Sequence, residues 1–340
     1  MFEKFITKRN LPSFRLKQLW QFYYQKGITN ANEITVWSKE LRQELAAEVD
    51  FNVFVKAEEF NSTNGNTTKV LFTRKDDGKV LESVLMQHHT GRNTVCVSCM
   101  IGCPVGCTFC ATGKLGFQGN LTADEIIEQV MYFQRKLLAQ GQRVSNVVFM
   151  GMGEPLLNLD NVLFAVSILT DPEKLGISDR KIAISTAGYY RQFEKLIAAG
   201  FKGRLAISLH APNQELREKI MPIAKANPLN ELFKSIDEYV AATNSRIFYE
   251  YLLIEGVNNS LEHAQALAKL LKNRLAHVNL IPFNPISESS FVKSKLDKTN
   301  AFKQELETLN ISVTIRTSMG AEIAGACGQL AGSKKSLNIN

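Results

Sequence analysis

The most informative stretch of this chain reads Cys103-Pro104-Val105-Gly106-Cys107-Thr108-Phe109-Cys110, so its cysteines have the spacing C-x3-C-x2-C. It directly follows a predicted strand over residues 93–98. Three thiolates this close together suit a four-iron cluster and leave one iron without a protein ligand, able to bind an amino-acid-like molecule. A zinc site with Cys99 as the fourth ligand, or a purely structural group of thiols, is the alternative. The loop position and the aromatic residue before the last cysteine favour the iron–sulfur interpretation.

Cysteine usage elsewhere argues against a disulfide framework. Five of the six cysteines fall within residues 96–110, and Cys327 stands alone near the C-terminus. In a chain of 340 residues without a signal segment, clustered thiols indicate metal binding or redox chemistry. The chain also lacks the run of about 18–20 apolar residues that crosses a bilayer. We therefore expect a soluble, cytoplasmic protein without membrane contact.

Strands and helices alternate from about residue 93 onward. This alternation predicts βαβ units and a parallel sheet, hence an α/β fold. Six units are too few for an eight-fold barrel, so we expect an open partial (β/α)6 barrel with its chemistry in the loops after the strands. The predicted strands are 93–98, 144–150, 181–186, 204–209, 247–254 and 276–281, the helices between them are 122–138, 158–169, 190–199, 229–242 and 260–274, and a helix at 298–309 and a strand at 311–317 close the series.

The residues before this barrel have a different pattern. Apolar residues at helical spacing predict a helix over 13–26 with Ser13 as N-cap, and a second helix begins at Ser38. Three strand-like runs follow, with Asp76-Asp77-Gly78 as a hairpin turn between the last two. The strand-like runs are 53–60, 67–74 and 79–86. The expected domains are a small N-terminal helical accessory domain (1–52), an antiparallel β extension (53–92), the barrel with a C-terminal cysteine loop (93–332) and a tail (333–340).

Charge is concentrated at the N-terminus. The chain has 40 basic and 33 acidic residues, a net charge of +7, and residues 1–26 contain six basic residues against one acidic residue. This asymmetry indicates a nucleic-acid partner, and the alternative is a solvated basic helix. Trp20, Phe22 and Tyr23 either contact that partner or, as an aromatic stripe at helical spacing more often does, form the packed face of the helix.

Four further motifs carry a resemblance. They are Gly151-Met152-Gly153-Glu154-Pro155, Ser208-Leu209-His210-Ala211-Pro212, Ile281-Pro282-Phe283-Asn284-Pro285 and Ala326-Cys327-Gly328-Gln329-Leu330. With the cysteine loop, they occur in the order found in the RlmN/Cfr family of radical S-adenosylmethionine (SAM) RNA methyltransferases. The chain resembles this family, and RlmN most, from about residue 10 to residue 332.

The resemblance implies a reaction. RlmN proteins methylate C2 of an adenosine in the peptidyl-transferase region of 23S rRNA and of the adenosine beside the tRNA anticodon. Adenine C2 is too electron-poor to attack a SAM methyl group, so a radical route is needed. In the family, one SAM methylates the late cysteine and a second SAM yields a 5′-deoxyadenosyl radical, which takes a hydrogen from that methyl group. The resulting methylene radical adds to C2, and another cysteine releases the methylated RNA by forming a disulfide.

The resemblance also assigns residues and partners. It implies one [4Fe-4S] cluster per chain, two SAM per turnover, 23S rRNA and tRNA as substrates, an electron donor such as flavodoxin or ferredoxin, and a monomer. The cluster ligands would be Cys103, Cys107 and Cys110, the SAM contacts Gly153, Glu154, Ser185, Ser208, Leu209, His210 and Asn284, the methylated cysteine Cys327, the disulfide-forming cysteine Cys96 and the proton acceptor Glu82.

Residue types alone leave simpler readings open for several of these positions. A lone late cysteine such as Cys327 is more often a buried small hydrophobic residue, and Cys96 could be a strand-packing thiol. Glu82 could be a solvated strand residue. His210 alone would more often be structural, and we expect its backbone to matter more than its imidazole. Cys99 stands where we expect serine in this family.

Two other functions remain open. The first keeps the fold and the radical route but methylates adenine C8, as Cfr does, which confers antibiotic resistance on the ribosome. The second is an iron–sulfur RNA-binding or redox-sensing protein without methyl transfer, which the combination of Cys96, Cys327 and the SAM motifs disfavours.

Overall fold

One curved sheet of ten strands organises the molecule. The structure, a computed structural model, describes residues 2–287 and 289–332. The strand order is β1-β2-β3-β4-β7-β8-β9-β10-β11-β12. The strands are β1 Phe54–Asn61, β2 Thr67–Arg74, β3 Val80–Gln87, β4 Asn93–Cys96, β7 Asn146–Phe149, β8 Ile182–Thr186, β9 Arg204–Ser208, β10 Ile247–Leu253, β11 Ala276–Pro282 and β12 Val313–Ile315.

The sheet combines the expected parallel and antiparallel parts. Neighbouring strands from β4 to β12 pair in parallel, whereas β1 to β4 pair antiparallel. Because the order ends at β1 and β12, the parallel strands form an open partial barrel, which confirms the predicted fold class. The antiparallel β extension is continuous with the barrel through the β3–β4 pair.

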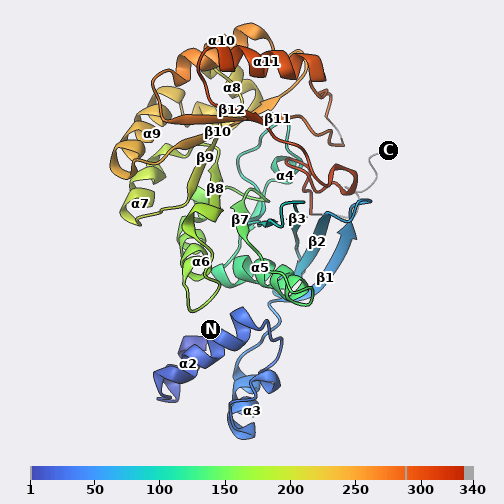
Figure 1. The fold of residues 1–340 in the computed structure, drawn as a ribbon, viewed down its shortest axis with the longest axis vertical. Coiled ribbons are helices and arrows are strands. Elements are labelled where there is room, and N and C mark those ends of the chain that lie inside the picture. The colour runs from blue at the N-terminus through green and yellow to red at the C-terminus, as the bar shows by residue number, and fades with distance from the viewer. Residues whose placement is uncertain (1, 288, 333–340) are drawn as a thin grey trace.

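Helices cover the outer side of this sheet, and Figure 1 shows them arranged around the barrel. The Thr122 side chain accepts from Glu125 N and the Glu125 side chain accepts from Thr122 N, which forms a capping box at the start of α5. The helices are α4 Ala111–Lys114, α5 Ala123–Leu138, α6 Leu159–Thr170, α7 Phe193–Ala198, α8 Gln214–Ile220, α9 Leu229–Thr243, α10 Leu261–Leu271 and α11 Leu296–Thr308. Short helical turns lie at Ala31–Glu33, Pro155–Asn158, Asp179–Lys181, Tyr190–Gln192, Pro222–Lys225 and Ala321–Ile323.

A small helical module precedes the sheet and lies beside α5 at one end of the molecule (Figure 1). It contains α1 Phe2–Lys8, α2 Ser13–Trp20, a π-helical turn Gln21–Gln25 and α3 Lys39–Glu48. The Tyr23 hydroxyl donates to Glu128 of α5 at 2.9 Å, so the module is packed against the barrel. The second helix was expected to begin at Ser38, and Ser38 is the N-cap residue of α3. The N-cap residue of α2 is Pro12, not Ser13, which is the first helical residue.

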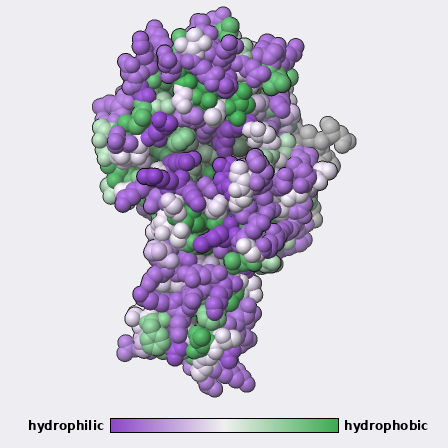
Figure 2. Space-filling model, viewed as in Figure 1, coloured by the Kyte–Doolittle hydropathy of each residue, from purple (hydrophilic) through white to green (hydrophobic). Residues whose placement is uncertain are grey.

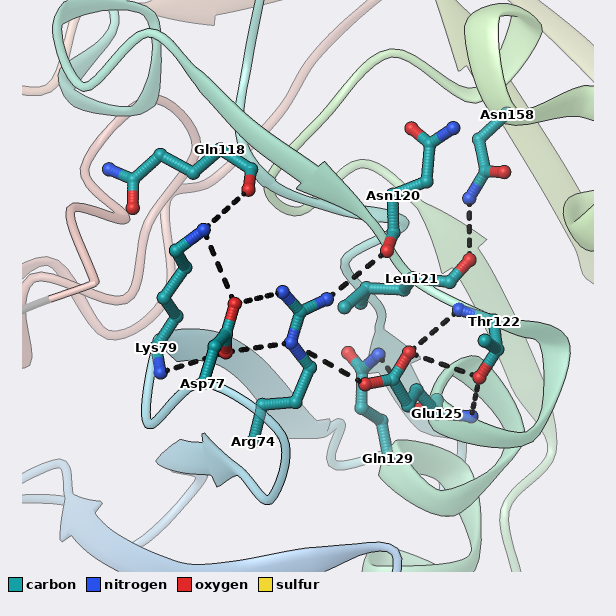
Figure 3. Close-up of polar contacts among 10 residues, drawn as sticks. All are labelled: Arg74, Asp77, Lys79, Gln118, Asn120, Leu121, Thr122, Glu125, Gln129 and Asn158. Carbon is teal, nitrogen blue, oxygen red and sulfur yellow. Dashed lines mark hydrogen bonds and ion pairs between the residues drawn. The ribbon is translucent and has the colours of Figure 1, made fainter.

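A second sheet of two strands was not anticipated. β5 Met100–Gly102 and β6 Phe117–Asn120 pair on either side of the cysteine loop. Figure 3 shows how the β2–β3 hairpin holds β6: Lys79 Nζ donates to Gln118 O at 2.8 Å, and Arg74 Nη1 donates to Asn120 O at 3.3 Å. The β extension therefore helps to fix the loop from which the cysteines project.

The surface fits a chain that packs its apolar residues inside. Figure 2 shows a predominantly hydrophilic face on which hydrophobic residues are scattered. Within the described residues, no helix is long and apolar enough to span a membrane.

Candidate active site

A cavity of about 910 Å³ opens at the carboxyl ends of the parallel strands. All three cysteines of the loop line it, together with residues that follow β7 or end β8 and β9. Of the predicted cofactor contacts it brings together Gly153, Glu154, Ser185, Ser208 and His210. The loops after consecutive parallel strands meet here as the fold predicts.

The three cysteine thiols line this cavity without converging on one point. Among the residues that the structure describes, no group of three His, Cys, Asp or Glu side chains is arranged to hold a single metal ion. A zinc ion needs its sulfur ligands about 2.3 Å from one centre, whereas a four-iron cluster binds each thiolate through a different iron. Cys99, the alternative fourth zinc ligand, is 2% exposed and does not line the cavity. The donor set therefore fits a cluster better than zinc.

Glu154 presents a buried carboxylate to this cavity. Its Oε1 accepts from Leu156 N at 3.0 Å and its Oε2 accepts from Ala187 N at 2.7 Å. Burial raises the pKa of the carboxyl group to about 7, although these backbone donors act in the opposite direction. A carboxylate held in place by backbone and only 3% exposed is suited to an ammonium group.

Gly153 lies so close to Cys99 and Met100 that a side chain is excluded. Its φ is +110°, and a Cβ would lie 2.7 Å from Met100 Cβ and 2.9 Å from Cys99 Sγ. Only glycine allows this approach. Nearby, the hydroxyl oxygens of Ser185 and Ser208 lie 3.3 Å apart across β8 and β9.

His210 is a buried, neutral side chain with a left-handed backbone. Its φ is +58°, and its Nδ1 accepts from Leu252 N at 3.1 Å. Burial lowers the pKa of the imidazole to about 3, so Nε2 carries the proton in the neutral ring. Its carbonyl accepts from Asn258 Nδ2 at 2.8 Å. Leu209 is fully buried and does not line the cavity.

Arg217 of α8 is a residue that sequence reasoning missed. Its guanidinium is fully buried and donates to three backbone carbonyls, those of Ala187 after β8, Leu209 after β9 and Asn227. Arg217 thereby fixes two of the cavity loops to each other. A single arginine on a short helix gives no sequence signal for this role.

A second cavity of about 750 Å³ adjoins the first and is lined by Cys96 and Cys327. Cys327, Cys110 and Arg316 line both cavities, so Cys327 stands at their boundary. Cys96 is buried, and loss of hydration and the neighbouring Cys327 raise the pKa of its thiol to about 12. Cys327 is accessible to solvent, yet the cavity walls raise the pKa of its thiol too. The two cysteines that sequence reasoning singled out are thus brought to one cavity.

Asn284 contacts the Cys327 loop and does not line the first cavity. Its Nδ2 donates to the Cys327 carbonyl at 3.1 Å. The loop is also held by Ala111 N, which donates to Gly328 O at 2.8 Å, so it lies against the end of the cysteine loop.

Arg316 and Glu250 form the other feature that sequence reasoning missed. Arg316 Nη1 lies 3.2 Å from Glu250 Oε2, and Asn279 Nδ2 donates to Glu250 Oε1 at 2.9 Å. Desolvation lowers the pKa of the Arg316 guanidinium. The Glu250 carboxylate and the thiols of Cys327 and Cys96 raise it by more, so the pKa lies above its ordinary value. Arg316 lines the two cavities already described and a third, of about 1760 Å³.

Comparison with known proteins identifies the family. The model of the radical SAM superfamily matches residues 97–271, about half of the chain. A protein of Symbiobacterium thermophilum named probable dual-specificity RNA methyltransferase RlmN is 47% identical over 320 residues, 94% of this chain and 85% of the relative. The chain belongs to the RlmN family. A Thermus thermophilus relative with the same name is 44% identical over 318 residues, 94% of this chain and 89% of the relative.

A solved structure supports the same conclusion. The crystal structure of a radical SAM methyltransferase from Sphaerobacter thermophilus superposes with a TM-score of 0.93 at 38% identity, and 96% of each chain is covered. Membership of the RlmN family, within the radical SAM superfamily, implies a [4Fe-4S] cluster and SAM. The thiols and the Glu154 carboxylate of the first cavity suit these two groups.

Glu82, the proton acceptor that the RlmN resemblance implies, lines none of the three cavities. It is fully buried on β3, so it is not the solvated strand residue that its sequence context alone favours. Its Oε1 lies 3.5 Å from Lys69 Nζ, and its Oε2 accepts from Ala331 N at 3.2 Å. Burial raises the pKa of the carboxyl group to about 7.

Ion pairs partly neutralise the basic N-terminal module, both within it and toward the barrel. Lys8 and Arg9 pair with acidic side chains of α3, and Lys17 pairs with Glu173. Phe22 and Tyr23 are buried, so the packed-face interpretation holds for them. The expected tail at 333–340 lies outside the described residues.

Proposed function

We propose that this protein methylates C2 of an adenosine in the peptidyl-transferase region of 23S rRNA and of the adenosine beside the anticodon in tRNA. One observation carries the proposal: Cys96 and Cys327 line one cavity, and Cys327 also lines the adjoining cavity of the three loop cysteines. A methyl transferase that used SAM directly would need neither thiol. The names of the 44–47% identical relatives support RNA as the substrate.

The residues of the first cavity would hold the cofactors. Cys103, Cys107 and Cys110 would hold one [4Fe-4S] cluster per chain, and when bound, the cluster with two SAM per turnover supplies one methyl group and a carbon radical. The Glu154 carboxylate would accept hydrogen bonds from the ammonium group of SAM. Gly153, Ser185, Ser208, His210 and the backbone of Leu209 would line its other parts. Asn284, whose side chain donates to the Cys327 carbonyl, would contact SAM from the loop after β11.

Cys327 would carry the methyl carbon between the cofactor side and the RNA side. Its position at the boundary of the two cavities gives its sulfur access to both. After the carbon has joined adenine C2, the protein and the RNA are covalently linked. The Cys96 thiolate would then attack the Cys327 sulfur, so that a sulfur–sulfur bond forms as the bond from Cys327 sulfur to carbon breaks. The carbon would keep the electron pair of that bond and take up a proton, which gives the methyl group on C2.

After the carbon radical has added to C2, a base must remove the C2 proton and the adduct must lose one electron, which the cluster, oxidised in the cleavage of SAM, would be able to accept. The family resemblance gives this role to Glu82, and its pKa of about 7 suits a proton acceptor near neutral pH. Because Lys69 and the backbone of residue 331 enclose its carboxylate, transfer to Glu82 requires either a relay through water or movement of residues 331–332.

The third cavity is a suitable entrance for RNA. It opens at the amino ends of the strands and is lined by three arginines and one glutamate, a surplus of two positive charges. It shares Met86, Met150 and Arg316 with the cavity of the two cysteines, so a base that enters here approaches Cys327 from the side away from the cluster loop. Arg204 lies over the Phe248 ring at 5.4 Å, which offers a charged and aromatic surface to an unstacked nucleotide.

The test is product analysis. The protein, reconstituted anaerobically with iron and sulfide, is given SAM, dithionite in place of a flavodoxin- or ferredoxin-type donor, and a 23S rRNA fragment or a tRNA. Mass spectrometry of the digested nucleosides should reveal 2-methyladenosine, and Cys327→Ala should abolish it. An 8-methyladenosine product would instead assign the Cfr-type reaction. SAM cleavage without any methylated nucleoside from either RNA would contradict the proposal.

A further inference from the structure

A buried ion pair underlies the loop that carries Cys327, and we propose that Lys69 and Glu82 form a clamp that positions Cys327 opposite Cys96. Both side chains are fully buried, and Lys69 Nζ lies 3.5 Å from Glu82 Oε1. The inference rests on the proposed roles of the two cysteines. It adds Lys69 as a positioning residue and gives Glu82 a function that requires no access to RNA.

The two charges hold opposite ends of the Cys327 loop. Lys69 Nζ donates to the Ala324 carbonyl at 3.4 Å, three residues before Cys327. Glu82 Oε2 accepts from Ala331 N at 3.2 Å, four residues after it. The backbone of Gly332 also donates toward this carboxylate and opposes the rise of its pKa. The ion pair therefore closes the base of the segment 324–331.

The preceding chain packs on the same strand. A Cβ on Gly320 would lie 2.7 Å from Thr67 Cγ2, so the chain passes directly over β2 before it reaches the loop. Thr67 and Lys69 are two residues apart in β2, which puts them on one face of the sheet. The chain therefore contacts this one face of β2 twice, at Gly320 through Thr67 and at Ala324 through Lys69.

The strand register connects the clamp to Cys96. Lys69 pairs with Val84 across β2 and β3, and Val84 pairs with Cys96 across β3 and β4. Directly opposed residues of antiparallel strands project from the same face, and Glu82 is two residues from Val84. Lys69, Glu82 and Cys96 therefore share one face, against which the Cys327 loop lies. The hydroxyl of Ser83 donates to the Cys96 carbonyl at 2.7 Å and fixes β3 to β4.

Charged residues at this position have a physical reason. The buried carbonyl of Ala324 and the amide groups of residues 331 and 332 need hydrogen-bond partners. An ionised donor and acceptor supply stronger bonds than neutral groups, and each charge compensates the other's desolvation. Burial lowers the pKa of Lys69 and raises that of Glu82, in agreement with an enclosed pair.

The stability of the Cys96–Cys327 disulfide measures this positioning. The unaltered protein is equilibrated anaerobically with reduced and oxidised glutathione, and the disulfide is quantified by peptide mass spectrometry. As the two thiols become a disulfide, one oxidised glutathione is reduced to two glutathione molecules. Because a positioned pair of thiols forms its disulfide more readily, Lys69→Met and Glu82→Gln should each lower the equilibrium constant about tenfold or more.

Two further variants separate positioning from misfolding and from a general effect of charge. The double variant Lys69→Met/Glu82→Leu leaves no unpaired charge and should fold, yet it should show the same fall. Glu59→Gln removes a different ion pair of the β extension, with Lys136 at 2.6 Å, and should leave the constant unchanged.

The outcomes distinguish failure of the clamp from failure of the proposed function. An unchanged constant in Lys69→Met and the double variant would overturn the clamp; so would a fall in Glu82→Gln alone. If the unaltered protein forms no Cys96–Cys327 disulfide, the release step of the proposed function fails. Amide hydrogen exchange then still decides the clamp: faster exchange over residues 324–332 in Lys69→Met than in Glu59→Gln supports it, and equal exchange overturns it.

Discussion

Arg316 Nη1 lies 3.2 Å from Glu250 Oε2, and this ion pair stands where the three cavities meet. Glu250 is 4% exposed, so its carboxylate depends on Arg316 and on Asn279 for compensation. Arg316 lines all three cavities, and Glu250 lines the first and the third. Loss of the Arg316–Glu250 ion pair should therefore affect both the stability of the protein and the reaction.

Breaking the Arg316–Glu250 pair should cost more than removing it. Arg316→Met leaves a buried carboxylate and should lower the free energy of unfolding by about 2–4 kcal/mol. Adding Glu250→Gln to Arg316→Met should recover part of that loss, as a double-mutant cycle in urea unfolding would measure. Strictly additive effects of the two substitutions would mean that the pair is not coupled.

The three loop cysteines should behave differently from Cys99. Alanine at Cys103, Cys107 or Cys110 should remove the broad visible absorbance of the reconstituted cluster, because each thiolate binds a separate iron. Cys99→Ala is the matched control and should keep it, since Cys99 lies outside the cavity. Retained absorbance in a loop variant, or its loss in Cys99→Ala, would refute the ligand assignment.

Arg204 should contribute to RNA binding through charge. Arg204→Ala removes one phosphate-neutralising charge at the entrance, so the slope of log affinity against log salt should become shallower by about 0.7–0.9. Lys202→Ala, an exposed residue outside the cavity, is the control with the same change in net charge. Fluorescence anisotropy with labelled RNA over a series of salt concentrations measures both. Equal slopes for the two variants would exclude the third cavity as the entrance.

His210 predicts a pH dependence of stability. Its folded-state pKa of about 3 lies below the ordinary value of 6.5, so between these values the unfolded chain binds the proton and the folded chain does not. The free energy of unfolding therefore rises with pH in this window, by up to about 1.4 kcal/mol per pH unit from this one group. His210→Gln keeps an acceptor for Leu252 N but cannot titrate. The difference in unfolding free energy between the two proteins should change across pH 4.5–6, and a constant difference would show that His210 is not buried in neutral form.

The sequence was sufficient for the order of the main elements. Periodicity located every strand of the large sheet and its principal helices, because buried β-branched runs and amphipathic helices leave strong local patterns. It missed α1, α4, α8 and the β5–β6 hairpin, which are short and held by tertiary contacts. Ser13 was misassigned as an N-cap because Pro12 supplies the extended residue before the helix.

From the sequence, only those residues of the candidate site could be predicted that a motif or the family resemblance identified. The three loop cysteines and Glu154 line the first cavity, Cys96 lines the second, and Cys327 lines both. The groups that support them, Arg217, the Arg316–Glu250 pair and Lys69, act through contacts between distant parts of the chain. Lys69 and Ala324, for example, are 255 residues apart. Such contacts have no local sequence signature.

The central claim is that Cys327 carries the methyl carbon and Cys96 releases the RNA, and one gel tests both. Cys96→Ala protein, loaded with its cluster and given SAM, reductant and RNA, should accumulate a covalent protein–RNA adduct on a denaturing gel. Cys327→Ala should form no adduct, and Cys99→Ala should behave as the unaltered protein does. Release of methylated RNA by Cys96→Ala at the normal rate, without an adduct, would contradict the account.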